Sequence, residues 1–321
     1  MPDRYVLGID IGGSTTKLAL VRAANDGHRI LWQDAIETRS TEAATVLVKR
    51  MAHAARPLLE AAPERVEGVG VGCPGLIDPG RGVVVLCTNI PHLTGFALRD
   101  ELSRAVGLPV ELQNDANAAA VGEFLFGSGR GTRNLIVLML GTGVGGGVIA
   151  DGHLLSGADN AAAELGHVKV DFGADATPCG CGKTGCLEAY VGLNGIARIA
   201  QRHLGGGARS CLSVDDLSTR RITDAARAGD EVARAILHEA GAYLGRGIAN
   251  FIETFNPEKI VIAGGASAAL DLLLPGIRES MQRFCCFAMT RDRAMIDHST
   301  IPDSVQFLGP ATVFLNAHRS A

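Results

Sequence analysis

The chain has 321 residues, of which 47% are hydrophobic and 20% charged, and its formal net charge is −4. This composition is that of a globular protein with room for two domains, and it excludes a disordered chain, a fibre or a disulfide-stapled mini-protein. The negative balance and the lack of a Lys/Arg-rich tract argue against a nucleic-acid partner. Glycine, with 41 residues against 4% aromatic, predicts tight turns and close backbone approach.

The start of the chain predicts a cytoplasmic protein. A strand-like run begins at Val6, so no charged-then-apolar leader precedes it. No stretch has the length of a membrane span, and we expect no attachment to a membrane. In such a compartment the eight cysteines are expected to stay free of disulfides.

The first third of the chain predicts alternating strands and helices. A β-hairpin with a glycine turn is expected over 5–21, and a helix with one apolar face within 41–62. A strand over 66–72, a short helix over 98–106 and a strand over 109–113 follow. This alternation implies an α/β sheet.

The rest of the chain repeats the pattern. Helices are expected over 116–126, 225–255 and 311–318, and strands over 134–140, 148–154 and 259–263. A second hairpin with a glycine turn is therefore expected. We place the domains over 1–117 and 118–303, with a C-terminal helix within 304–321 that returns to the first domain.

Three glycine turns directly follow predicted strands. Backbone amides in such turns can bind phosphate, and Asp10 at the first turn can hold Mg²⁺. Each turn alone is more often a simple hairpin turn, and the spacing fits neither a Walker loop nor a Rossmann fingerprint. Together they predict a phosphate site, which the resemblance described below makes a nucleotide site, with the candidate residues Asp10, Gly12, Gly13, Ser14, Thr15, Lys17, Gly141, Thr142, Gly143, Gly264 and Gly265.

A cluster of cysteines predicts a metal site. Cys179, Cys181 and Cys186 lie close together, and His167 lies twelve residues before the first of them. Three thiolates and one imidazole form a closed set typical of tetrahedral structural zinc. Simple burial of the cysteines is the alternative, but the many glycines in this segment leave little core to bury them in.

The glycine turns resemble those of the actin-like ATPase and sugar kinase superfamily. Segments 114–120, 164–167 and 179–190 resemble the ROK family of bacterial sugar kinases and repressors, and matching segments run from about residue 6 to 266. The resemblance implies an α/β fold of two ribonuclease-H-like domains with a nucleotide and sugar cleft between them. It also implies ATP and Mg²⁺ as cofactors, structural Zn²⁺ and a homodimer.

The resemblance also assigns roles to residues. Asp115 corresponds to the catalytic base and Asn114 to a sugar ligand, although an Asp at a helix start is by itself more often an N-cap. Glu164, His167 and Glu188 match residues that bind sugar hydroxyls, and for the two glutamates a solvated surface charge is the alternative. Gly75 and Asn89 match loops that line the sugar pocket.

The leading substrate is glucose, phosphorylated at its 6-hydroxyl. N-acetylmannosamine, N-acetylglucosamine and fructose are alternatives, because Ala163 stands before Glu164 where many glucose-type members have Gly. The loop after Asn89 also lacks a Trp often found there. Such differences bias the choice of sugar without deciding it.

A sugar-sensing regulator is the alternative from another class. Regulators of this family carry an N-terminal DNA-binding helix-turn-helix, whereas here the first strand begins within ten residues of Met1. An inactive sugar-binding relative is a further alternative, which the presence of Asp10, Asp115 and all three glycine turns disfavours. We therefore expect an enzyme.

Overall fold

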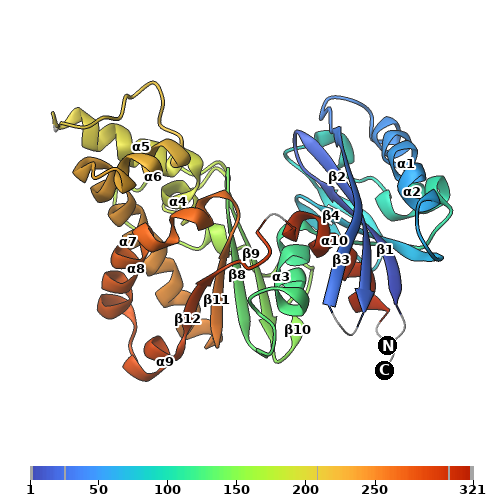
Figure 1. The fold of residues 1–321 in the computed structure, drawn as a ribbon. Helices are drawn as coiled ribbons and strands as arrows, with labels where there is room; N and C mark the ends of the chain where they lie inside the picture. The colour runs from blue at the N-terminus through green and yellow to red at the C-terminus, as the bar shows by residue number, and fades with distance from the viewer. Residues whose placement is uncertain (1–2, 25–26, 208, 303, 319–321) are drawn as a thin grey trace.

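The computed structural model describes residues 3–24, 27–207, 209–302 and 304–318, which form two lobes with a five-stranded sheet in each (Figure 1). The first sheet has the order β3 (Gly27–Glu37), β2 (Thr15–Ala24), β1 (Arg4–Ile11), β4 (Val66–Cys73) and β7 (Val110–Asn114). The second has the order β10 (His153–Leu154), β9 (Val144–Ala150), β8 (Leu135–Leu140), β11 (Lys259–Ala263) and β12 (Met295–His298).

The two sheets have the same plan. In each, an antiparallel hairpin (β1 with β2, β8 with β9) is extended by two parallel strands (β4 and β7, β11 and β12). Parallel strands need long crossovers, which the helices supply. The expected α/β architecture with a hairpin at the start of each half is confirmed.

Each sheet is covered on both faces, because successive residues of its strands point to opposite sides. In the first sheet, Leu7 and Ile9 pack under α1 (Ala44–Glu60) and α2 (Leu98–Val106), while Val6 faces α10 (Val305–Ala317). In the second, Ile136 belongs to the core under the lobe's helices and Val137 faces α3 (Asp115–Phe126). Helices α3 and α10 thus lie between the two sheets (Figure 1).

The outer layer of the second lobe holds six helices within the described ranges. These are α4 (Glu188–Val191), α5 (Leu193–Gly205), α6 (Thr219–Arg227), α7 (Glu231–Phe255), α8 (Leu270–Phe284) and α9 (Ala288–Arg293). A small hairpin of β5 (Leu76–Asp78) and β6 (Val83–Leu86) extends from the first lobe, and short 3₁₀ turns span Pro91–Leu93, Leu165–His167 and Gly265–Ala269. In the part of the chain that the structure describes, no helix is long and apolar enough to cross a bilayer.

Helix α10 packs backbone to backbone on the first sheet. A Cβ added to Gly70 on β4 would lie 1.8 Å from the carbonyl oxygen of Pro310, and one on Gly8 would lie 2.5 Å from that of Phe307. A Cβ on Gly68 would meet the ring of Phe314 at 2.1 Å. Glycine at these three strand positions therefore lets the helix approach closely.

Several predicted elements need correction. The helix expected over 225–255 is two helices, because Gly229 has φ +98° and Asp230 caps α7 by accepting a hydrogen bond from the amide of Ala233 (2.9 Å). The last helix begins at Val305 rather than at 311 and continues through Pro310. The second strand of the second hairpin begins at Val144, four residues before the predicted start.

The predicted domain boundary, residue 117, lies within α3, and the division into domains stays a prediction. Residue 303, the last of the predicted second domain, and residues 319–321 of the predicted C-terminal segment lie outside the described residues. Strand β3 and helices α5 and α8 are elements that the sequence patterns did not predict.

Candidate active site

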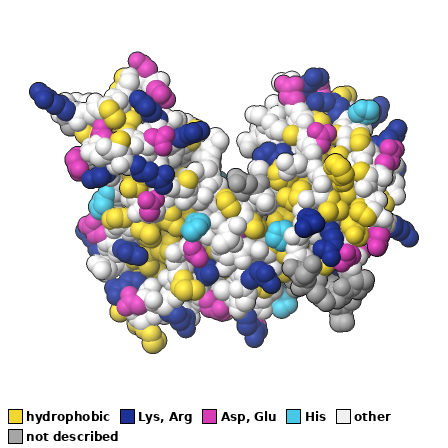
Figure 2. Space-filling model, viewed as in Figure 1, with side chains coloured by type: hydrophobic (Ala, Val, Ile, Leu, Met, Phe, Trp, Pro, Cys, Tyr) yellow, Lys and Arg dark blue, Asp and Glu magenta, His cyan; other side chains and the backbone are white. Residues whose placement is uncertain are grey.

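A cavity of about 1090 Å³ lies between the two lobes, and the hollow is visible between them in Figure 2. Its walls are the ends of strands from both sheets, the start of α3 and the segment that leads into α10. Among the predicted site residues that line it are Asp10, Gly75, Asn89, Asn114, Asp115, Gly141, Gly143, Glu164, His167, Cys181, Glu188, Gly264 and Gly265.

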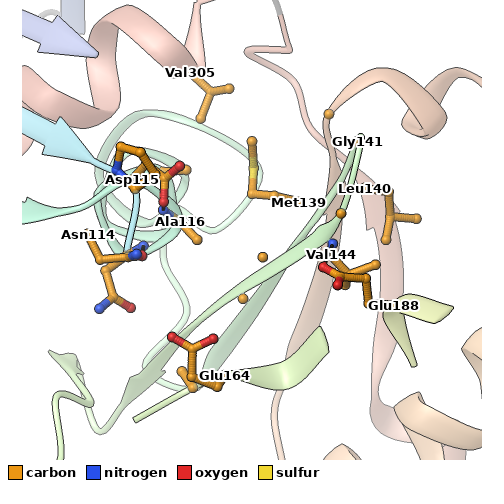
Figure 3. Close-up of a pocket in the computed structure, with 18 of the residues that line it drawn as sticks. Asn114, Asp115, Ala116, Met139, Leu140, Gly141, Val144, Glu164, Glu188 and Val305 are labelled. Atoms are coloured by element: carbon orange, nitrogen blue, oxygen red, sulfur yellow. Dashed lines mark hydrogen bonds between the residues drawn. The ribbon is translucent and has the colours of Figure 1, made fainter. Parts of the chain in front are cut away.

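Asp115 is the first residue of α3, and its carboxylate is directed into the cavity (Figure 3). The cap of this helix is Asn114, whose Oδ1 accepts a hydrogen bond from the amide of Asn117 (3.1 Å). Its Nδ2 donates to the carbonyl of Gly75 (3.1 Å), which joins two cavity loops. The N-cap alternative for Asp115 is therefore wrong: its Oδ1 accepts a hydrogen bond from the amide of the next residue, Ala116 (2.9 Å), and its carboxylate lines the cavity. Burial raises the pKa of Asp115.

Asp10 lies at the end of β1, close to Asp115. Gly72 on the neighbouring strand separates them: a Cβ added there would lie 3.5 Å from Oδ1 of Asp10 and 3.6 Å from Cα of Asp115. Burial and the charge of Asp115 raise the pKa of Asp10 to about 7, although Lys17 opposes this. Two partly buried carboxylates whose charges act on one another favour a cation nearby.

The first glycine turn borders the cavity rather than lining it. Its shape is fixed by a hydrogen bond from the amide of Gly12 to the carbonyl of Thr15 (3.1 Å) and by the hydroxyl of Thr38, which donates to the carbonyl of Gly12 (2.6 Å). Gly13, Ser14 and Thr15 are exposed. Lys17 donates a hydrogen bond to Gln306, which does line the cavity.

The other two glycine turns lie at the same edge of the second sheet, because β8 and β11 are parallel neighbours. Gly264 adopts φ +83°, and a Cβ on it would lie 2.5 Å from the carbonyl oxygen of Leu140. Thr142 is the one residue of these two turns that is not among the residues around the cavity. Two sets of backbone amides therefore converge on one region.

The glycines that follow the second turn make room for elements that pack on both faces of strand β9. Gly145, Gly146 and Gly147 belong to strand β9, and added Cβ atoms would clash with Ala116, Leu165 and Ala120 at 2.9, 2.7 and 2.4 Å. Gly145 and Gly147 thus let α3 lie close against the second sheet, and Gly146 makes room for Leu165 of the 3₁₀ turn Leu165–His167 on the other face.

Polar side chains from the second lobe face Asp115 across the cavity. Glu164 points toward the space in front of Asp115, and Glu188 lies beside Val144 (Figure 3). Oε2 of Glu188 accepts a hydrogen bond from the amide of Val144 (3.0 Å). Burial raises the pKa of Glu164, and His167 opposes the shift.

The predicted metal ligands converge. One ligand atom from each of His167, Cys179, Cys181 and Cys186 lies within 4.8 Å of every other. Nδ1 of His167 is 3.7 Å from Sγ of Cys179, and Nζ of Lys169 donates to Sγ of Cys186 at 2.7 Å. Three thiols and an imidazole at these separations fit a tetrahedral zinc ion.

Sequence reasoning missed the wall of the cavity formed by the segment between β12 and α10. His298, Ser299, Pro302, Val305 and Gln306 all contribute to it. A start of α10 at Val305 would have indicated this wall, but the internal Pro310 pointed to a later start. Ala163, beside Glu164, adopts φ +65°, a conformation that favours glycine, and alanine at this position carries no local signal of it.

Comparison with known proteins adds independent information. The sequence model of the ROK family matches residues 6–316. A glucokinase from Halalkalibacterium halodurans is 38% identical over 299 residues, which are 91% of this chain and 88% of that protein. The DNA-binding transcriptional repressor Mlc of Escherichia coli is 35% identical over 221 residues, which are 68% of this chain and 54% of the repressor.

The fold is also that of solved structures. A ROK family glucokinase from Streptomyces griseus, solved in complex with glucose and AMPPNP, superposes with a TM-score of 0.80 at 33% identity. The match covers 96% of this chain and 98% of that one.

Proposed function

This chain belongs to the ROK family, and on that premise we propose that it is a glucokinase, which transfers the γ-phosphoryl group of ATP to the 6-hydroxyl of glucose. The observation that carries the proposal is the place of Asp115. Its carboxylate lies in a cavity between two lobes, opposite polar side chains and near two converging glycine turns. Phosphoryl transfer to a sugar needs this set: a base for the hydroxyl and backbone donors for the phosphates.

Asp115 acts as the general base. A raised pKa brings a carboxylate closer to the pH at which it can take a proton from a hydroxyl as the phosphorus is attacked. Asn114, fixed by Gly75 and by its own helix, holds a neighbouring sugar hydroxyl. Together they orient the 6-hydroxyl toward the donor phosphate.

The glycine turns bind the nucleotide. The turns with Gly143, Gly264 and Gly265 offer backbone amides at one edge of the second sheet, the amide of Gly141 shapes its turn by donating to the carbonyl of Gly143 (3.0 Å), and residues 12–15 and Lys17 approach from the first lobe. Asp10 holds Mg²⁺, which neutralises charge on the transferred phosphate when bound. In-line transfer then runs from the nucleotide edge toward Asp115.

Carboxylates and amides bind the sugar. Glu164, Glu188 and Asn89 accept or donate several hydrogen bonds to a polyol, with His167 and the loop at Gly75 completing the pocket. Glu164 and Glu188 approach from the second lobe and Asn89 and Gly75 from the first, so the sugar is held between the lobes in front of Asp115.

The loop of Cys179, Cys181, Cys186 and His167 holds a structural zinc ion. The convergence of the four side chains supports this, and four protein ligands leave no open position for chemistry. Cys179 and Cys186 are also buried in the hydrophobic core of the second lobe, contrary to the expectation that this glycine-rich segment has little core to bury them in, and zinc binding adds to the stability of the loop. Since Cys181 and His167 also border the cavity, the ion shapes the sugar pocket.

The enzyme works in the cytoplasm as a homodimer whose domains, divided near residue 117, close around the substrates. These proposals rest on the resemblance to the family. A sugar-sensing regulator is the second candidate, which the repressor relative favours. Of the two candidate functions, only the kinase requires Asp115 to take part in a catalysed reaction.

Release of ADP, measured with a coupled assay across glucose, mannose, fructose, N-acetylglucosamine and N-acetylmannosamine, tests the proposal. We expect glucose to give the highest kcat/KM. A higher kcat/KM for another sugar would show that this sugar, not glucose, is the preferred substrate, and would still support a sugar kinase. No turnover with any sugar, combined with measurable sugar binding, would favour the regulator.

A further inference from the structure

Glu123 is a fully buried carboxylate that has no part in the proposed chemistry. It lies on α3, two turns after Asp115, and its side chain is 0% exposed. The hydroxyl of Ser299 donates to Oε1, and the amide of Ser128 donates to Oε2 (2.9 Å). A Cβ on Gly127 would lie 2.0 Å from Oε2, so the chain provides a space that only glycine leaves free.

The partners of Glu123 lie on the segments by which the chain passes between the lobes. The first passage is α3 with the turn at Ser128, which leads from β7 to β8. The second is the segment from His298 to α10, which leads from the second sheet back to the first. Any rotation of one lobe against the other bends both passages.

Further hydrogen bonds join the same two passages. The hydroxyl of Ser128 donates to the carbonyl of His298 (2.7 Å) and accepts from the amide of Thr300 (3.1 Å). The hydroxyl of Ser299 accepts from the amide of Ile301 (3.1 Å), and the amide of Ser299 donates to the carbonyl of Ile262 (2.9 Å). The second passage is therefore tied to α3 by side chains that are themselves buried.

The two ends of this arrangement reach opposite parts of the cavity. Asp115 begins the helix that carries Glu123, whereas Ser299, Val305 and Gln306 form the wall that the second passage contributes. The wall lies on the nucleotide side, because Gln306 accepts a hydrogen bond from Lys17 of the first glycine turn. Loss of the hydrogen bonds that join the two passages would shift this wall relative to Asp115, the proposed catalytic base.

We propose that Glu123, with Ser128 and Ser299, is a hinge clamp that fixes the nucleotide wall of the cavity relative to Asp115. Glu123 and Ser128 are positioning residues, since neither is among the residues around the cavity. The expected effect on KM and kcat rests on the proposed kinase activity. The expected effect on hydrogen exchange in the second passage does not depend on that activity.

Variants of the two positioning residues test the clamp. In Ser128→Ala the hydrogen bonds of the hydroxyl to His298 and Thr300 are lost, while the amide that binds Glu123 remains. Glu123→Gln is the conservative variant, because its amide oxygen can accept from Ser128 while its NH₂ group donates to Ser299, whose hydroxyl can turn. Glu123→Ala loses both bonds. Ser280→Ala is the matched control: Ser280 is also buried and donates to one backbone carbonyl, that of Ala242, in a distant part of the second lobe.

Steady-state kinetics at a temperature where all variants are folded gives the first readout. We expect Ser128→Ala and Glu123→Ala to raise KM for ATP about fivefold or more and to lower kcat, with Glu123→Gln and Ser280→Ala close to wild type. A purely structural role would lower only the amount of active enzyme and leave KM unchanged. Unchanged KM in both disruptive variants, or a loss in Glu123→Gln equal to that in Glu123→Ala, would overturn the proposal.

Hydrogen exchange of the amides of residues 299–301 gives a readout independent of activity. We expect faster exchange in Ser128→Ala and Glu123→Ala than in Ser280→Ala and wild type. Equal exchange in all four proteins would overturn the clamp even if the kinase is confirmed. If exchange is faster in Ser128→Ala and Glu123→Ala but the wild-type protein shows no turnover with any sugar, the clamp is supported and the proposed function is rejected.

Discussion

The carboxylate of Glu188 accepts a hydrogen bond from the backbone amide of Val144 at 3.0 Å, and its other oxygen lies 3.4 Å from Sγ of Cys179. One side chain thereby joins the strand that follows the second glycine turn to a residue of the cysteine cluster. The glycine at 143 is required for this contact, since a Cβ there would lie 2.3 Å from Oε2 of Glu188. The sugar end and the nucleotide end of the cavity are thus connected at Glu188.

This connection predicts a graded response to substitution at Glu188. Glu188→Ala leaves the amide of Val144 without its partner and removes a sugar ligand, so KM for glucose should rise about tenfold or more. Glu188→Gln, which can still accept from Val144, should lose less. Steady-state kinetics with both substrates checks this, with Glu239→Ala as a control, because Glu239 pairs with Arg202 and His203 on the outer surface of the same lobe. Equal KM for glucose in Glu188→Ala and wild type would contradict it.

Asp115→Asn should leave the fold intact and nearly abolish turnover. The amide keeps the shape of the side chain but cannot take a proton, so kcat should fall by about 10²–10⁴-fold. Rapid quench or coupled kinetics measures the loss, and circular dichroism with thermal melting checks the fold. A variant with near wild-type kcat would show that Asp115 is not the base.

Asp10→Asn should stabilise the protein at neutral and alkaline pH while removing activity. The pKa of Asp10 is raised from 3.8 to about 7 by burial and by Asp115, so the stability that the neutral form contributes is present below about pH 4 and lost as pH rises through 7. The gain in Tm of the variant over wild type, measured without Mg²⁺, should therefore grow between about pH 4 and 7 and level off above. A gain that is largest at acid pH would contradict the shifted pKa.

Zinc should be lost when one ligand is removed. Cys181→Ser removes the exposed thiol of the cluster, and we expect metal analysis to show well under one zinc per chain together with a lower Tm. Cys286→Ser is the control, because Cys286 is an exposed thiol outside the cluster. Wild-type protein that contains no zinc after gentle purification would exclude the metal site.

Strand patterns and motifs predicted much of the fold and the centre of the cavity. Runs of apolar residues such as those of β1, β8 and β11 have few alternatives to burial in a sheet, and the glycine turns follow directly from where these strands end. Asp115 and Glu188 were found through their motifs, because local sequence fixes their position on the first turn of a helix.

What could not be predicted depends on contacts between distant segments. The internal prolines of α8 and α10, Pro275 and Pro310, are typical of helix starts or breaks, and tertiary packing overrides that preference. Gly145 to Gly147 have the same composition as a phosphate loop, yet what decides their role is the packing of α3 and of Leu165 against them. The left-handed conformation of Ala163 is likewise not indicated by its sequence, because alanine rarely adopts it.

The packing of α10 on β1 and β4 also constrains how the protein is made. Val6, Ala19 and Val21 lie on the face of the first sheet that packs against α10. Their hydrophobic partners there, which cover this face, include Leu308 and Phe314. During synthesis the strands of this sheet leave the ribosome long before that cover exists. The first lobe therefore cannot complete its core until α10 has been made, and this apolar face of its sheet is exposed up to that point of synthesis.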